Sequence, residues 1–102
     1  MDATVRSAAV ERSGGACEFC GSNGAGFPLE FDHLFSRREA DHITTGVMLC
    51  RVCHFNRTNN APSAQANIRK ALDWAYRNGY DVTAGRLKAR LDVQILKFGI
   101  KP

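Results

Sequence analysis

Apolar side chains are scattered in the first part of the chain and recur at helical spacing in the last part. Residues 1–13 form a polar lead-in that predicts one or two turns of helix, and Gly14-Gly15 ends it. The glycine-rich segment 17–26 and the charged, polar segment 36–45 predict loops. The first part therefore predicts short elements joined by loops.

Two short apolar runs in this part predict strands. Residues 27–35 alternate apolar and polar side chains towards their end, which is typical of a short strand. Residues 47–49 form a second apolar run, long enough for a brief strand. A helix is then expected from residue 51 to about residue 59.

The last part of the chain predicts two helices. In the first, apolar residues follow helical spacing at Ile68, Ala71, Leu72, Ala75 and Tyr76. Asn60 is the expected cap and Pro62 suits the first turn, while Asn78-Gly79 is a stop signal. We expect Trp74 to be a core anchor, with a stacking surface as the alternative.

The second helix is expected over residues 83–98. Leu87, Leu91, Ile95 and Phe98 form one apolar stripe, and Gly99 closes the helix. We expect this stripe to belong to the core rather than to a partner surface. The two helices make a C-terminal extension, residues 61–102, after a first domain of residues 1–60.

The composition is that of a small soluble protein. The chain has 102 residues, of which 44% are hydrophobic and 24% charged, and no apolar run approaches the roughly 20 residues of a membrane helix. Its first residues lack the apolar stretch of a secretory signal. We therefore expect a cytoplasmic protein that does not contact the membrane and has no lasting disulfides.

The charge is unevenly distributed along the chain. Residues 1–50 carry four basic and seven acidic residues, a formal charge of −3, whereas residues 51–102 carry ten basic and three acidic residues, a formal charge of +7. A basic half of this kind favours a polyanionic partner, most simply nucleic acid. The alternative is a basic surface that only contacts solvent.

The four cysteines form two pairs, Cys17-x-x-Cys20 and Cys50-x-x-Cys53. Two thiolates three residues apart can hold one metal ion from a tight turn, and two such turns complete a tetrahedral zinc site. Gly21 permits the positive φ that such a turn often needs. A site with four sulfur ligands has no open position, so this zinc would be structural. Free thiols, disulfides or a redox pair are the alternatives.

Three further residues can carry chemistry at this site. Asp32 and His33 are adjacent at the end of the first predicted strand, so their side chains should point to opposite sides. His54 follows the second cysteine pair directly. If both pairs bind one zinc ion, the strand end and the start of the next helix are held close together.

Taken together, these motifs resemble a known enzyme family. Cys17-x-x-Cys20, Asp32-His33, Leu49-Cys50-x-x-Cys53-His54 and Arg57 resemble the zinc-containing HNH endonucleases, whose fold is the ββα-metal or His-Me finger. The resemblance covers about residues 17–60. It implies a small ββα-metal finger stabilised by a four-cysteine zinc site. The two C-terminal helices lie outside the resemblance and come from the apolar spacing alone, so the whole chain is expected to be an α+β protein.

The resemblance also implies an activity. It implies a metal-dependent DNA endonuclease that hydrolyses phosphodiester bonds, by nicking or double-strand cutting, and leaves a 3′-hydroxyl and a 5′-phosphate. His33 matches the general base, and a neutral imidazole suits that role near neutral pH. Asp32 and His54 match the ligands of one catalytic divalent ion, for which Mg²⁺, Mn²⁺, Ni²⁺ and Zn²⁺ all suit oxygen and nitrogen ligands. Short proteins of this family often occur in phage, which implies the cytoplasm of a bacterial or phage-infected cell.

The sequence departs from the family at one position. Thr45 stands where the family has an asparagine, which braces the loop and helps to orient the general base. Because threonine lacks the second group of the amide, a catalytically weak or inactive zinc-stabilised DNA-binding module is an alternative. A zinc-stabilised protein-interaction domain, with the C-terminal helices as its contact surface, is a third reading.

Several charged residues remain to be assigned. Arg37, Arg38 and Arg57 are candidates for contacts with the DNA backbone. His42 matches no family position and is expected to be a loop histidine, while Glu39 and Asp41 are expected to be solvated loop charges. The two C-terminal helices could also pair two chains as a homodimer.

Overall fold

The structure is a computed structural model and describes residues 3–59 and 64–101. The chain divides into two compact units, residues 1–54 and residues 55–102. A two-stranded antiparallel sheet and four helices occupy the described ranges, so the expected α+β class is confirmed. The boundary expected between residues 60 and 61 stays a prediction.

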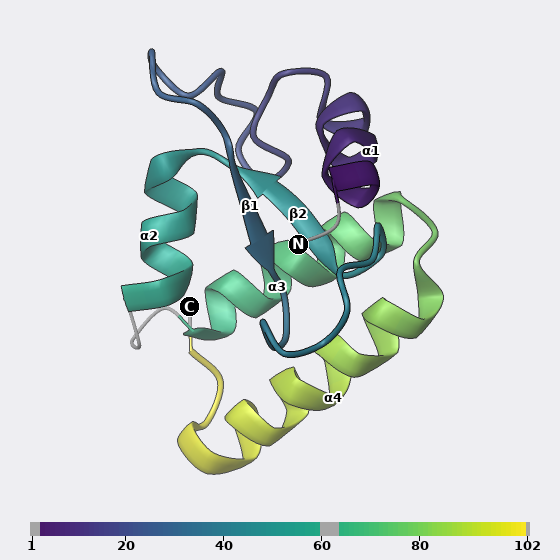
Figure 1. The fold of residues 1–102 in the computed structure, drawn as a ribbon. Helices are drawn as coiled ribbons and strands as arrows, with labels where there is room; N and C mark the ends of the chain where they lie inside the picture. Colours follow the sequence, from purple (N-terminus) through teal and green to yellow (C-terminus); the bar gives the residue numbers. More distant parts are fainter. Residues whose placement is uncertain (1–2, 60–63, 102) are drawn as a thin grey trace. The chain divides into compact units, whose positions relative to one another are not determined.

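The two strands form a hairpin. β1 (Glu30–His33) pairs antiparallel with β2 (Gly46–Leu49), with Glu30 opposite Leu49 and His33 opposite Gly46 (Figure 1). β1 is shorter than the predicted strand over residues 27–35. Pro28 has no N–H for a ladder hydrogen bond, and the Phe27 N–H instead closes a turn onto the Gly24 carbonyl at 3.0 Å.

Helix α1 (Ala3–Ser13) packs against β2. The prediction of one or two turns was wrong, because this helix is 11 residues long. Its burial explains the difference: Ala9 is fully buried in a cluster with Phe31 and Met48 of the hairpin. A contact between distant parts of the chain thus stabilises a segment whose own sequence is polar and weakly patterned.

Helix α2 (Arg51–Asn59) follows β2 after a single intervening residue, as predicted from the sequence. Cys50 is the connecting residue, and its carbonyl accepts the His54 N–H at 3.0 Å in the first turn. The short link fixes Cys53 and His54 close to the end of the hairpin.

Residues 55–102 contain a pair of packed helices, α3 (Ala64–Arg77) and α4 (Asp81–Phe98). The stop at Asn78-Gly79 is confirmed, since α3 ends at Arg77 and Gly79 has a φ of 71°. Gly99 closes α4 as expected, and its N–H reaches the Ile95 carbonyl at 2.8 Å. The expected cap and first-turn residues of α3, Asn60 and Pro62, lie outside the described residues.

Trp74 of α3 is fully buried and meets the Tyr80 ring edge-on. The expectation of a core tryptophan is therefore confirmed. The predicted apolar stripe is only partly buried: Leu87 lies in the core, whereas Phe98 is 58% exposed. Tyr76 of α3 is also exposed, although it belongs to the apolar spacing that predicted this helix. In the part of the chain that the structure describes, no helix is both long and apolar enough to span a membrane.

Candidate functional site

The four cysteine sulfurs gather at one point of the first unit. The Sγ atoms of Cys17, Cys20, Cys50 and Cys53 all lie within 4.8 Å of one another, and those of Cys20 and Cys50 are 3.7 Å apart. A tetrahedral zinc ion with bonds of about 2.3 Å places its sulfurs ~3.8 Å apart. The expected pairing of the two cysteine motifs is confirmed, and the cluster is positioned to hold a metal ion.

Backbone hydrogen bonds shape the first cysteine turn. The Cys17 N–H donates to the Ser22 carbonyl at 2.7 Å, and the Gly21 N–H donates to the Cys17 carbonyl at 2.9 Å. Gly21 has a φ of 78°, the left-handed conformation expected for a metal-binding turn. In the second pair, the Cys53 N–H points to the Cys50 sulfur at 3.5 Å, at the start of α2.

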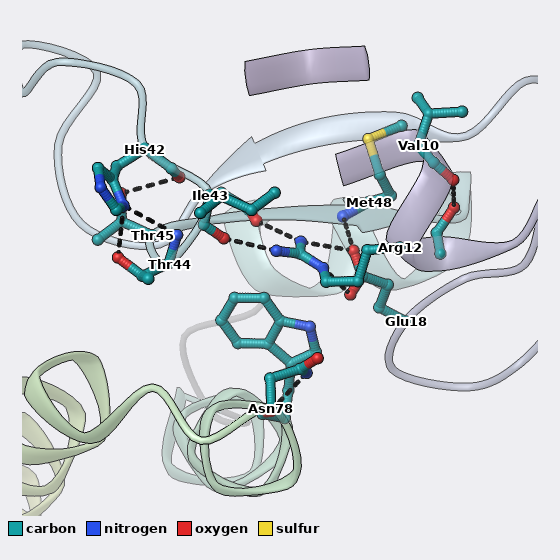
Figure 2. Close-up of polar contacts among 12 residues, drawn as sticks. Val10, Arg12, Glu18, His42, Ile43, Thr44, Thr45, Met48 and Asn78 are labelled. Carbon is teal, nitrogen blue, oxygen red and sulfur yellow. Dashed lines mark hydrogen bonds and ion pairs between the residues drawn. The ribbon is translucent and has the colours of Figure 1, made fainter. Parts of the chain in front are cut away.

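Glu18, inside the first cysteine turn, joins this turn to β2. Its backbone N–H donates to the Met48 carbonyl at 2.9 Å, and its carboxylate accepts the Met48 N–H at 3.1 Å. The same carboxylate receives the guanidinium of Arg12 from α1 (Figure 2). Because β2 leads directly to Cys50, these bonds hold the two cysteine pairs in register.

The cysteines differ in their affinity for a proton. Burial alone raises the pKa of Cys17, but N–H groups of Cys20, Cys50 and Phe19 lower it to about 7. For Cys53, burial and the neighbouring sulfurs of Cys50 and Cys20 together raise the pKa. A bound dication favours the thiolate form of every ligand, so it would offset the repulsion among four sulfurs.

A second group of side chains lies where β1 faces the start of α2. The Nε2 atom of His54 is 3.7 Å from Oδ1 of Asp32. The other ring nitrogen of His54, Nδ1, is hydrogen-bonded to the Glu30 carboxylate. Glu30 and Asp32 are two residues apart on β1 and thus project to the same face. Glu30 was not predicted as a site residue from the sequence, although its spacing of two residues from Asp32 was a usable signal.

His33 does not belong to this group and contacts other residues. Its Nε2 atom is 2.8 Å from Oδ1 of Asp41, and its ring meets the edge of Phe31 with centroids 5.2 Å apart. Asp41 was expected to be a solvated loop charge, and that expectation was wrong, because its side chain is only 7% exposed. The loop folds back on the strand and buries the carboxylate against the imidazole.

Thr45 lies immediately before β2. Its carbonyl accepts the Leu34 N–H at 3.0 Å, and its hydroxyl donates to the His42 carbonyl at 3.4 Å. The first bond joins the two ends of the loop, and the second closes a turn within it. His42 is exposed in this turn, as expected for a loop histidine.

The arginines proposed for phosphate contacts lie in two places. Arg37 and Arg38 are exposed in the loop after β1. Arg57 lies on α2 and lines a hollow of about 630 Å³ within residues 55–102, together with Arg90 of α4. The rest of the hollow is lined by Ala64, Asn67, Ile68, Ala89, Val93 and Gln94.

Comparisons with protein-family models, with curated proteins and with solved structures found no match.

Proposed function

We propose that this protein is a metal-dependent DNA endonuclease of the HNH type that hydrolyses phosphodiester bonds. The observation that carries the proposal is the approach of His54 Nε2 to Asp32 Oδ1, at 3.7 Å, beside the cysteine cluster. These two residues are far apart in the sequence and are the ligand pair that the resemblance to the HNH family implies.

The residues fit one divalent ion. Two ligand bonds of about 2.1 Å can span up to ~4.2 Å, so a gap of 3.7 Å allows a shared ion. Glu30 accepts the Nδ1–H of His54, which leaves the Nε2 lone pair directed to the Asp32 side. Histidine ligands in metal sites commonly have such a carboxylate partner. The cysteine cluster would hold a separate zinc ion, since thiolates prefer soft metals.

His33 supplies the base in the proposed reaction. Its imidazole takes a proton from a water molecule, and the water oxygen then forms a bond to the phosphorus. The bond from phosphorus to the 3′ oxygen breaks, and this oxygen takes up a proton from solvent. A divalent ion held by Asp32 and His54 would offset the negative charge on the leaving oxygen.

Exposed basic side chains of the second unit support a nucleic-acid partner. Its exposed residues include Lys70, Arg86, Lys88, Arg90 and Lys97. The hollow of about 630 Å³ has two guanidinium groups, from Arg57 and Arg90, and no acidic residue among those that line it. Basic groups around a hollow favour the phosphodiester backbone, with little discrimination among base sequences.

A catalytically inactive DNA-binding module is the second candidate. The observation in its favour is Thr45, whose hydrogen bonds go to Leu34 at the other end of the loop and to His42 within it, and not to His33. This candidate predicts salt-dependent DNA binding without cleavage in any divalent metal ion. Pairing of two chains is a separate proposal, supported by the exposed apolar end of α4, where Leu96 is 87% exposed.

Plasmid cleavage tests the proposed activity. Supercoiled plasmid is incubated with the protein and Mg²⁺ or Mn²⁺, beside the variants His33→Ala and His54→Ala. We expect nicked or linear product from the wild-type protein, and at least a ~100-fold slower reaction from either variant. His42→Ala is the matched control: His42 is exposed in the same loop region, so this variant should cleave at the wild-type rate.

Two results would contradict the proposal. One is a plasmid left equally intact by the wild-type protein and by His33→Ala in every metal ion tested. The other is cleavage that survives in His33→Ala at the wild-type rate, which would indicate a contaminating nuclease. A gel shift at low salt, without cleavage, would then favour the DNA-binding module.

A further inference from the structure

The contact between Asp41 and His33 has no role in the function proposed so far. Asp41 belongs to a polar loop in which carboxylates are normally solvated, yet its side chain is only 7% exposed. Its Oδ1 atom lies 2.8 Å from Nε2 of His33, whose side chain is 19% exposed. A buried carboxylate generally requires a hydrogen-bonded partner, and the imidazole is one.

The chemistry of the two groups sets the direction of this hydrogen bond. An ionised carboxylate can only accept, so Nε2 of His33 carries the hydrogen and donates it to Asp41. A neutral imidazole has one N–H group, and the lone pair is therefore on Nδ1. The edge contact with Phe31, at 82° between the ring planes, restricts the ring further.

We propose that Asp41 is a positioning residue that fixes the tautomer and the ring orientation of His33. This inference rests on the proposed endonuclease function, in which His33 is the general base. Thr45, at the position of the family's asparagine, bonds to Leu34 and His42 instead. Asp41 thus supplies from the loop a constraint on the base that the threonine does not.

The surroundings of the imidazole suit this role. A cavity of about 10 Å³ adjoins His33 and is lined by Phe35, Ser36, Glu39, Ala40 and Thr45 as well. Its volume is at the lower limit for a single water molecule. When Nδ1 takes a proton from the attacking water, His33 becomes an imidazolium, and the Asp41 carboxylate stabilises that positive charge. The same division of roles operates in hydrolases that use a carboxylate-imidazole pair.

The tautomer of His33 can be measured directly, without DNA and without added divalent ions. Protein labelled with ¹⁵N at its histidine rings gives separate signals for protonated and unprotonated ring nitrogens, and His33→Gln identifies the signals of His33. We expect the Nε2–H form in the wild-type protein and a mixture of tautomers in Asp41→Asn. In plasmid cleavage, Asp41→Asn should lower kcat by about 100-fold and leave KM unchanged.

Glu11→Gln, which removes an exposed carboxylate from α1, is the control and should change neither the tautomer nor kcat. Equal melting temperatures of the wild-type protein and Asp41→Asn exclude unfolding as the cause of a slower reaction. An Nδ1–H form in the wild-type protein, or a wild-type kcat in Asp41→Asn, would overturn the inference. If the wild-type protein cleaves no DNA, the proposed function fails instead, and the ring signals distinguish the two failures.

Discussion

Arg12 and Glu18 are joined by two charge-assisted hydrogen bonds, of 2.8 Å from Nε and 2.7 Å from Nη2. Both side chains are nearly buried, with 13% and 6% exposed. Arg12 also donates to the Ile43 carbonyl at 2.5 Å and to the Gly46 carbonyl at 2.7 Å. One guanidinium therefore links α1, the first cysteine turn and the start of β2 (Figure 2).

Replacing Arg12 by methionine should strongly destabilise the first unit. The change leaves the Glu18 carboxylate buried without its cation, which typically costs about 3–5 kcal/mol. Urea unfolding measures the loss. The matched control is Arg77→Met. This change breaks an ion pair with Asp73 whose N–O distance, 2.8 Å, is similar, but which lies on an exposed helix face. Exposed pairs contribute less than ~1 kcal/mol, so equal losses in the two variants would contradict the interpretation.

The cysteine cluster should bind one zinc ion per chain, and Cys50→Ser should lose it. A serine hydroxyl is a far poorer zinc ligand than a thiolate, and the other three sulfurs cannot complete the tetrahedron. Elemental analysis of purified protein measures the metal. His42→Gln should keep the zinc, because His42 lies in an exposed turn outside the cluster. A full zinc content in Cys50→Ser would exclude the four-sulfur site.

Much of the fold could be predicted from local sequence signals. Three predictions depended on neighbouring residues alone, and each was confirmed. They are the helix with apolar spacing around Trp74, its stop at Gly79, and the strand over the second apolar run. The approach of the two cysteine pairs could also be predicted, because a tetrahedral zinc site needs four ligands and each pair supplies only two.

The remaining features depend on contacts between distant segments. Neither the full length of α1 nor the burial of Asp41 could be predicted, because each depends on a surface contributed by the hairpin. Turns at Ser36–Glu39 and His42–Thr45 fold the loop back towards β1, and such a path leaves no periodic signal in the sequence. The polar composition of the loop therefore predicted a solvated Asp41, although the path of the loop buries this side chain.

Gly46 packs where no larger residue fits. A Cβ atom built at this position would lie 2.1 Å from Cζ of Phe31, in the core below α1. Gly46→Ala should therefore lower the free energy of unfolding by about 1–3 kcal/mol. Gly85→Ala is the control: it adds the same methyl group within α4, with no atom within 4 Å. That change should raise stability by about 0.5–1 kcal/mol, and destabilisation by both variants alike would contradict the packing argument.

Glu30→Gln should weaken the binding of a divalent ion at Asp32 and His54. The Glu30 carboxylate accepts the Nδ1–H of His54, and loss of such a partner typically reduces metal affinity about 10- to 100-fold. Titration with Mn²⁺, followed by electron paramagnetic resonance on zinc-loaded protein, measures the affinity. Glu11→Gln removes a charge without this contact and should bind Mn²⁺ like the wild-type protein. Equal affinities in all three proteins would show that Glu30 does not support the ion.

Arg57 and Arg90 should each contribute about one phosphate contact. Both line the hollow of the second unit, so Arg57→Gln and Arg90→Gln should weaken DNA binding and each lower the salt slope by about 1. Binding is measured with a labelled duplex in EDTA at several salt concentrations, where no cleavage takes place. Arg77→Gln removes a positive charge from α3 outside the hollow, beside its partner Asp73. If Arg77→Gln lowered the slope as much as the other two changes, the hollow would have no special role, and general charge alone would account for the binding.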